Sequence, residues 1–392
     1  MKIIRIDDMH CDAGWRTFSF LKITTDDGIT GWSEYTEADG SRGLTAVIRG
    51  LAEPLIGQDP RPVQQIASTL WVRQVQAPGG INSRAIAAIE NALLDIKGKA
   101  LGVPVYELFG GPVRERIPVY WSHCGSYRVR NHELVGVPPL RTYDDIAALG
   151  AEVKRRGFKA LKTNILPFEG GKLSNFGPGF GRSPGYPELN CDRATLRAVH
   201  DLLSAFRQGA GPDMGLHLDV NYHFKTEGYL QIAKAVAPFD MTWLEIDTWD
   251  PQALALIRRS APCPIASLES VCGRRAFRPF LDNYSCDVAI IDVIWNGFLE
   301  SIKIAAMAEA YEVNCAPHNY YGHLCSAISA HFCAVVPNFR VMEIDIDSVA
   351  WRDELFHNPP AIENGELIIP KGPGWGVEVN EAAVRAHPPR SH

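Results

Sequence analysis

The sequence predicts an α/β protein whose larger part is a closed barrel of parallel strands. From about residue 117 onward, short apolar runs alternate with amphipathic helical stretches, a pattern typical of consecutive βα units. There are eight such runs, and eight strands close a TIM barrel. The runs are IPVYWSH (117–123), FKALKTN (158–164), LHLDVN (216–221), TWLEI (242–246), PIASLES (264–270), DVAIIDV (287–293), VNCAPHN (313–319) and FRVMEIDI (339–346).

The N-terminal part has a different pattern, which predicts an α+β domain over residues 1–115. TFSFLKITT (17–25), an Asp-Gly turn and ITGWSEY form a predicted hairpin. Apolar residues then recur at helical spacing from 83 to 100, and Gly102 and Pro104 end that helix. We expect the barrel to occupy residues 116–350 and the segment 351–392 to pack back on the first domain.

One segment interrupts the βα rhythm of the barrel. Residues 165–190 are rich in glycine and proline and follow the second strand. Because this segment lies inside a βα repeat, we expect it to be a lid or binding loop rather than a linker.

The composition excludes several classes of protein. The chain has 392 residues, 46% hydrophobic and 21% charged, with a net charge of −6. This is an ordinary globular balance, and its acidity argues against nucleic-acid binding. No apolar run is long enough for a signal peptide or a membrane span. Nine scattered cysteines without a CxxC motif indicate reduced thiols, so we expect a cytoplasmic protein without disulfides or a zinc site.

One acidic or imidazole side chain stands near the end of each predicted strand from the third onward. These residues are Asp219, Glu245, Glu269, Asp292, His318 and Glu343. In a closed barrel these strand ends meet on one face, where the active sites of such barrels lie. Isolated buried charges are costly, whereas charges gathered around a cation are not. The first three are carboxylates, which suit Mg²⁺ better than zinc; pairing with Arg or Lys across the barrel mouth is the alternative.

Two further side chains have a predicted role in proton transfer or substrate binding. His318 follows Asp292 by one strand, and a carboxylate at one ring nitrogen fixes the tautomer and raises the basicity of the other. Lys162 lies on the second strand, near the predicted metal strands. A neighbouring cation should lower the pKa of Lys162, so that it acts as a base, or it binds a substrate carboxylate as a cation.

These motifs resemble the enolase superfamily, in particular its mandelate racemase subgroup within the mandelate racemase/muconate lactonizing enzyme-like proteins. AAIENALLDIKGKALGVPVYELFGG (87–111) is similar to the helix and turn that precede the barrel in that family. LDVN, WLEI and SLES resemble its three metal-ligand strand ends. IIDVIWNGFLESIKIAAMAEAYEVNCAPH (290–318) is similar to the segment that carries the Asp–His dyad, and VMEID to the strand with a substrate-binding acid.

The resemblance implies both a fold and a cofactor. The fold is a modified (β/α)7β TIM barrel with an N-terminal capping domain that the C-terminal tail completes. Mg²⁺ is held by Asp219, Glu245 and Glu269. Asp292 and His318 form the dyad, and Glu343, protonated through burial, donates a hydrogen bond to the substrate carboxylate as it becomes an enediolate. The family also suggests a symmetric homo-oligomer.

Two positions depart from the family pattern, and the first affects the expected reaction. The second strand ends in Lys162-Thr163-Asn164 where the family often has Lys-x-Lys, so a neutral amide replaces the second base. The family's Glu-Glu-Pro is Glu245-Ile246-Asp247 here. Racemisation needs a base on each face of the carbon, whereas one histidine can serve a dehydration as base and acid. We therefore expect a dehydratase that converts an aldonate, such as galactonate, fuconate or lyxonate, to a 2-keto-3-deoxy acid.

Several alternatives stay open from the sequence. A racemase, epimerase or cycloisomerase on the same scaffold would use Lys162 as the missing base, and a metal-binding scaffold without turnover is a third possibility. Either His318 or Lys162 takes the α-proton. The substrate is a small carboxylate, and we expect Asn164, Asn221, Arg16 and Trp15 to contact it, although a surface Arg beside a packing Trp is equally compatible. Neither the stereochemistry of the substrate nor the role of His223 follows from the sequence.

Overall fold

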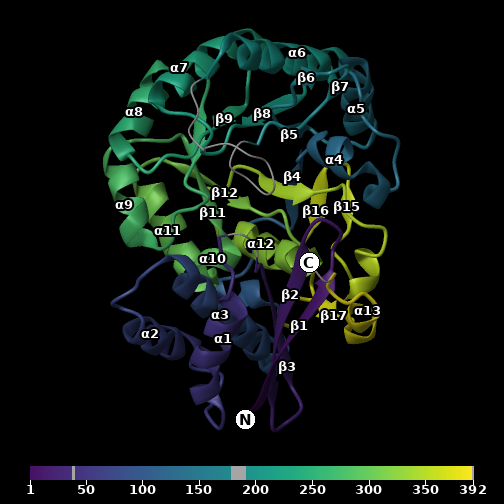
Figure 1. Cartoon of the computed structure of the whole chain (residues 1–392). Coiled ribbons are helices and arrows are strands. Elements are labelled where there is room, and N and C mark those ends of the chain that lie inside the picture. The colour runs from purple at the N-terminus through teal and green to yellow at the C-terminus, as the bar shows by residue number, and fades with distance from the viewer. Residues whose placement is uncertain (38–39, 178–190, 391–392) are drawn as a thin grey trace.

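The chain folds into a small N-terminal α+β part and a larger barrel ringed by helices (Figure 1). The computed structural model describes residues 1–37, 40–177 and 191–390. The predicted lid therefore lies partly outside the described residues, and its first half contains a short hairpin of β6 (Phe168–Glu169) and β7 (Lys172–Leu173). None of the described helices combines the length and the apolar character that crossing a bilayer requires.

The N-terminal part is an antiparallel three-stranded sheet covered by helices. It contains β1 (Ile3–Asp12), β2 (Thr17–Thr25), β3 (Thr30–Tyr35), α1 (Leu44–Ala52), η1 (Glu53–Leu55), α2 (Val63–Arg73), α3 (Gly80–Leu101) and η2 (Val105–Phe109). The predicted β2–β3 hairpin is confirmed. The helix α3 packs so closely on β3 that a side chain at Gly31 would meet the Ala92 carbonyl oxygen at 2.2 Å, so glycine is required there.

The sequence pattern did not predict β1, because most of its residues are half-buried or exposed and show no alternation of apolar and polar side chains. The strand β1 forms because its backbone pairs with that of β2 along its length.

Eight parallel strands form the barrel, as predicted. They are β4 (Arg116–Ser122), β5 (Ala160–Asn164), β8 (Gly215–Asp219), β9 (Trp243–Glu245), β10 (Ile265–Ser267), β11 (Val288–Asp292), β12 (Asn314–His318) and β13 (Met342–Asp345). The strands pair in chain order from β4 to β12, and β13 pairs with β4. A parallel bridge between Cys315 and Phe339 joins β12 to the segment before β13, which closes the ring.

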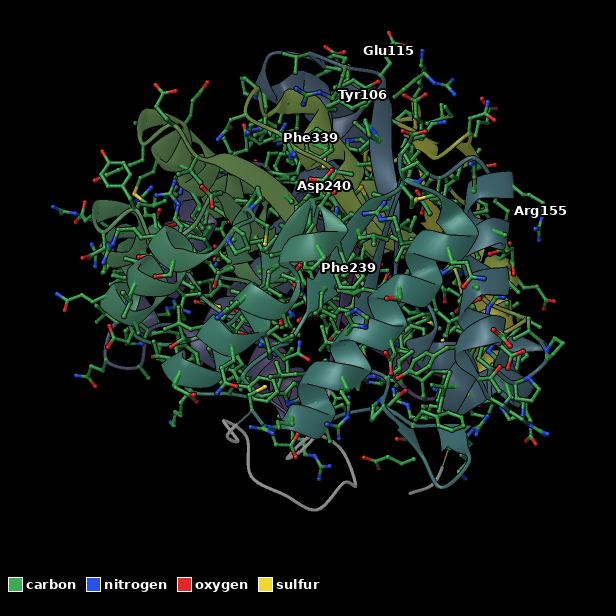
Figure 2. The ribbon with its side chains drawn as sticks, turned by 90° about the horizontal axis from the view of Figure 1, so that it is seen from above. Tyr106, Glu115, Arg155, Phe239, Asp240 and Phe339 are labelled. Carbon is green, nitrogen blue, oxygen red and sulfur yellow. The ribbon has the colours of Figure 1, made fainter. Side chains whose placement is uncertain are left out.

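Helices on the outside connect successive strands. They are α5 (Tyr143–Arg155), α6 (Arg193–Ala210), α7 (Thr226–Ala235), α8 (Pro251–Ser260), α9 (Arg274–Asp282), α11 (Phe298–Ala310) and α12 (His323–Val335). Short helices α4 (Ser126–Val135) and α10 (Val293–Asn296) follow β4 and β11, and η3 (Ala237–Phe239) precedes β9. Seen from above in Figure 2, Phe239 and Asp240 lie together at the turn that leads into β9. The (β/α)7β architecture is thereby confirmed.

Side chains fill the barrel interior and form the floor of the face described below. Tyr120, Trp243, Ala266, Val288, Ile290 and Ala316 make a separate apolar cluster from five different strands. The His217 ring stacks on Trp243 at a centroid distance of 3.7 Å. Burial lowers the pKa of His217 well below its usual value, so the ring is a neutral packing group.

The C-terminal segment contacts both parts of the protein. It contains η4 (Asp353–Leu355), β14 (Phe356–His357), β15 (Ile362–Glu363), β16 (Glu366–Ile368), β17 (Glu378–Val379) and α13 (Glu381–Ala386). The strand β16 pairs with the start of β4, and the Trp375 backbone N–H donates to Asp95 on α3 at 2.9 Å. The helix α13 lies beside β1, and Glu381 forms an ion pair with Lys22 of β2 (Figure 1).

Candidate active site

Six polar side chains lie at the carboxyl ends of the barrel strands, on one face of the barrel. Asp219, Glu245, Asp292 and His318 are the last residues of β8, β9, β11 and β12, Glu343 lies in β13, and Glu269 follows β10 by two residues. All but Glu269 are buried. The parallel direction of the strands brings these ends together, as expected for a barrel of this kind.

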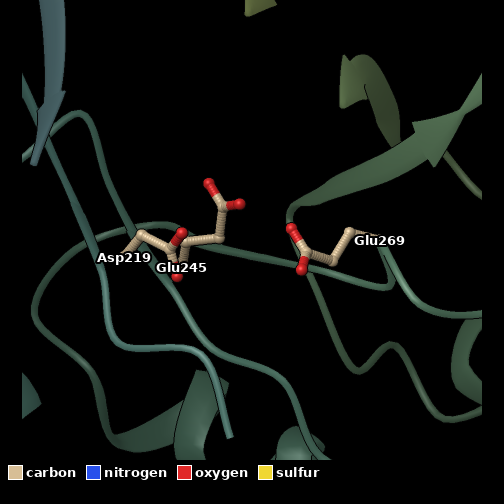
Figure 3. Close-up of side chains that lie close together, drawn as sticks. All are labelled: Asp219, Glu245 and Glu269. Carbon is tan, nitrogen blue, oxygen red and sulfur yellow. The ribbon is translucent and has the colours of Figure 1, made fainter. Parts of the chain in front are cut away.

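Three of these carboxylates converge on a common space. One oxygen from each of Asp219, Glu245 and Glu269 lies within 4.8 Å of the other two. Figure 3 shows Asp219 and Glu245 side by side on neighbouring segments and Glu269 facing them. Leu268, the residue before Glu269, has a φ of 91°, a left-handed conformation that is strained for leucine. Such strain is typical of functional sites, and here it accompanies the turn that carries Glu269 into the cluster.

Hydrogen-bond donors around the triad orient its carboxylates. Asp219 Oδ1 accepts from the backbone N–H and the side-chain amide of Asn221, both at 2.9 Å. Glu245 Oε2 accepts from Trp243 Nε1 at 3.0 Å. Each carboxylate oxygen has two lone pairs, so these bonds orient the groups and leave acceptor capacity free. Three oxygen ligands without nitrogen or sulfur fit Mg²⁺.

Lys162 of β5 reaches the centre of the site. Its Nζ lies 2.9 Å from Glu245 and from Glu343, and 3.7 Å from Asp219. Pairing of the acids with a lysine across the barrel mouth, the alternative to a metal, therefore occurs at two members of the triad, Glu245 and Asp219. Burial by itself would lower the pKa of Lys162, but Glu245 and then Glu343 outweigh it and hold the pKa well above its usual value. The expected lowering of this pKa was for a site that holds a cation and stays a prediction; among the described residues the charges nearest to Lys162 are carboxylates, which act in the opposite direction.

Glu343 is an acceptor and is held ionised. Its carboxylate accepts from the Ser122 hydroxyl, from the Asn319 backbone N–H at 2.8 Å and from Lys162. Burial would raise the pKa of Glu343, but Lys162, followed by His318, outweighs burial and lowers it. The predicted protonated acid is therefore wrong: the prediction counted burial and did not include a lysine that reaches across from β5.

His318 and Asp292 are direct neighbours on β12 and β11. His318 Nδ1 lies 2.7 Å from Asp292 Oδ2, which also accepts from the Tyr321 hydroxyl at 2.6 Å. Asp292 therefore keeps a proton on Nδ1, and Nε2 faces Glu269 at 3.5 Å. Burial would lower the pKa of His318, but Glu269 and then Asp292 raise it to about 10.

The residues predicted to contact substrate mostly have protein partners. Asn164 accepts from the Ser126 hydroxyl at 2.9 Å, and the Asn221 amide binds Asp219 as described. His223, whose role the sequence left open, is buried with its ring edge-on to Phe176 at 5.4 Å.

Arg16 reaches from the N-terminal part to the barrel and does not lie at the surface. It donates to Asp345 at 3.0 Å and to the Tyr127 hydroxyl, and its guanidinium lies 5.0 Å from the Tyr320 ring centroid. Trp15 packs on Tyr127 at a centroid distance of 4.5 Å. Both residues thus lie where the N-terminal part meets the barrel mouth.

The sequence reasoning missed Asp247 on this face. Asp247 is 3% exposed, and its Oδ2 has no hydrogen-bond partner among the described residues. Burial, followed by the charges of Glu269 and Asp219, raises the pKa of Asp247 well above its usual value. Its position two residues beyond Glu245, where the sequence departs from the family pattern, was the signal that could have identified it. His123 directly follows β4, and its Nδ1 lies 2.8 Å from Asp345, a partner on a strand distant in sequence.

Family models cover both parts of the chain. The model described as mandelate racemase/muconate lactonizing enzyme, N-terminal domain, matches residues 12–110. The model described as enolase C-terminal domain-like matches residues 145–383.

Relatives of known name differ in activity. A D-galactonate dehydratase of Ralstonia nicotianae is 31% identical over 98% of this chain and 94% of its own. A D-galactarolactone cycloisomerase of Agrobacterium fabrum is 29% identical over 94% of this chain and 90% of its own.

Among solved structures, a proposed L-alanine-DL-glutamate epimerase of Burkholderia xenovorans strain LB400 has a TM-score of 0.97 and 49% identity. It covers 100% of this chain and 99% of that chain. The same protein has also been solved with bound magnesium and fumarate, with a TM-score of 0.97 over 99% of this chain and 96% of that chain.

Proposed function

We propose that the chain, which belongs to the mandelate racemase/muconate lactonizing enzyme family of the enolase superfamily, is a Mg²⁺-dependent acid-sugar dehydratase. Members of this family are enzymes, and so is this protein. The observation that carries the proposal is a single proton-transfer dyad beside a carboxylate triad. His318 is bonded to Asp292, while Asn164 stands at the position where a second base would be expected. Dehydration needs only one such group, since the same imidazole can remove one proton and deliver another.

The comparisons support this proposal in two ways. Relatives named D-galactonate dehydratase and D-gluconate dehydratase match 98% and 97% of the chain. The solved relative with magnesium and fumarate binds an organic acid together with the metal that the triad fits.

Asp219, Glu245 and Glu269 would hold the Mg²⁺, which supplies Lewis-acid withdrawal of charge from the substrate carboxylate. Lys162 stays protonated between Glu245 and Glu343 and adds a fixed positive charge beside the same carboxylate. We therefore assign Lys162 as a cation and not as the base. Glu343 holds this ammonium in place and does not itself donate.

His318 takes the α-proton at Nε2, while Asp292 keeps the other nitrogen protonated and the ring in place. The C–H electron pair becomes the second bond of an enediolate. The enediolate then expels the β-hydroxyl, which takes the proton from His318 and leaves as water, and the resulting enol tautomerises to the 2-keto acid. Glu269 is the main cause of the raised pKa of His318. A cation bound by Glu269 would compensate this negative charge, so that His318 would become an effective base.

An epimerase is the second candidate, because the solved relative with 49% identity carries that assignment. Epimerisation would require a base on the other face of the substrate, and Lys162 would have to fill that role. Its two ion pairs at 2.9 Å oppose loss of its proton.

A screen of aldonates and aldarates with Mg²⁺ in deuterated water tests the proposal. We expect a 2-keto-3-deoxy product from at least one acid sugar, and His318→Asn should abolish its formation. His200→Asn, on the exposed face of α6, is the matched control and should retain activity. Deuterium in recovered substrate without any keto product would refute the dehydratase and establish an epimerase.

A further inference from the structure

Arg84 is a cation without an acidic partner at the junction between the two parts of the protein. It lies in the first turns of α3 and is half-buried. Among the described residues its one specific contact is the Trp295 ring, with the guanidinium carbon 3.7 Å from the ring centroid. Its Nε is buried and has no hydrogen-bond partner in the described part of the chain. A buried donor without an acceptor is destabilising, so the hydrogen bonding of Arg84 is incomplete in the protein alone.

Trp295, the aromatic residue that Arg84 contacts, belongs to the active-site face. Trp295 lies on α10, its ring centroid is 5.2 Å from that of His318, and its backbone N–H donates to Asp292 at 2.8 Å. The guanidinium carbon and the imidazole centre are separated by at most the sum of 3.7 Å and 5.2 Å, about 9 Å. Arg84 therefore approaches the dyad from the capping side.

A second arginine at this junction provides a comparison. The guanidinium of Arg16 already donates to Asp345, so its charge is compensated within the protein. Arg84 has no such partner in the described residues, although it lies about as deep in the junction. An arginine with free donors beside a site for organic acids is suited to a carboxylate, because the guanidinium fork matches carboxylate geometry.

We propose that Arg84 binds a second carboxylate of the substrate, whose first carboxylate lies at the triad and Lys162. The inference rests on the proposed function of this site and narrows its substrates to diacids, such as aldarates, in preference to aldonates. Arg84 is then a specificity-determining residue, because it contacts the far end of the substrate and not the reacting carbons.

A purely structural role of Arg84, holding Trp295 against His318, predicts different behaviour. Loss of that packing would weaken a diacid and a monoacid alike. Loss of a carboxylate contact would weaken only the diacid.

Binding of succinate and of butyrate to the Mg²⁺-loaded protein, measured by calorimetry, separates these roles without any turnover. We expect wild type to prefer succinate by about tenfold or more, the effect of a hydrogen bond to a charged group. Arg84→Gln should remove the preference, and Arg84→Lys should retain part of it. Arg275→Gln is the matched control, because Arg275 also covers a tryptophan ring, that of Trp71, at 4.9 Å.

Equal affinity of wild type for the two acids would overturn the inference, and so would an unchanged preference in Arg84→Gln. If Arg84→Gln does not fold, wild type and Arg84→Lys still decide. When wild type is selective, a reduced preference in Arg84→Lys supports the contact, because lysine cannot form the guanidinium fork, and an unchanged preference contradicts it. A diacid preference that depends on Arg84, without keto product in the sugar screen, would refute the dehydratase alone.

Discussion

Replacing Lys162 by methionine should destabilise the metal-free protein strongly. Methionine keeps most of the aliphatic length of lysine and removes the charge. Glu245 and Glu343 are 1% and 0% exposed and would each lose a cation at 2.9 Å. Removing one partner of a buried ion pair leaves an uncompensated charge and costs about 3–5 kcal/mol.

The cost should depend on pH, because the stranded carboxylates can take up protons. In the variant Glu343 loses its main cation, so its folded pKa rises above that of the unfolded chain, near 4.3. Burial already raises the pKa of Glu245 to about 8 in the wild type, and loss of Lys162 raises it further. The folded state then binds more protons than the unfolded state, and stability falls as pH rises through this window. The deficit relative to wild type should therefore be small at about pH 5 and approach about 3–5 kcal/mol at about pH 8.

Urea unfolding in EDTA at both pH values measures this difference. Lys303→Met is the control, because Lys303 is half-buried on α11 and donates to the Gln64 side chain. The double variant Lys162→Met/Glu343→Gln should regain part of the loss, since one stranded charge is removed. A deficit below about 1 kcal/mol at pH 8, the size of an exposed ion pair, would refute the buried geometry.

Two further predictions concern the junction and the metal site. Burial where α3 meets α11 raises the pKa of Glu90 to about 8, although the group accepts from the Leu299 N–H at 2.8 Å. Because the folded pKa of this acid is raised, the wild-type protein loses stability as pH rises from about 4.5 to 8. The free energy of unfolding of Glu90→Gln should therefore increase relative to wild type over this range, by at most about 5 kcal/mol at 1.36 kcal/mol per pKa unit. Equal differences between the two proteins in urea unfolding at pH 5 and at pH 9 would contradict this. Asn221→Ala removes the side-chain donor that orients Asp219, and Mg²⁺ affinity measured by calorimetry should fall about 10–100-fold, as for other groups that orient metal ligands; an unchanged affinity would show that Asn221 does not serve the site.

The barrel and the carboxylate triad could be predicted from the sequence because both depend on local pattern. Each apolar run ends at its own charged residue, and once eight parallel strands are assumed, the strand direction alone puts Asp219, Glu245 and Glu269 on one face. The pairing of Asp292 with His318 follows in the same way, because the two residues end adjacent strands.

The charge states and the cross-strand partners required the tertiary structure. Whether Glu343 is protonated depends on a lysine that reaches it from β5, a distance that no spacing in the sequence encodes. The same holds for Arg84, whose position beside the dyad exists only because α3 packs against α10. Local periodicity depends on the order of residues, and it determined the fold and the grouping of the three carboxylates. Electrostatic interaction depends on separation in space, and so the folded chain alone decided which of these groups carry charge and which charge has no partner.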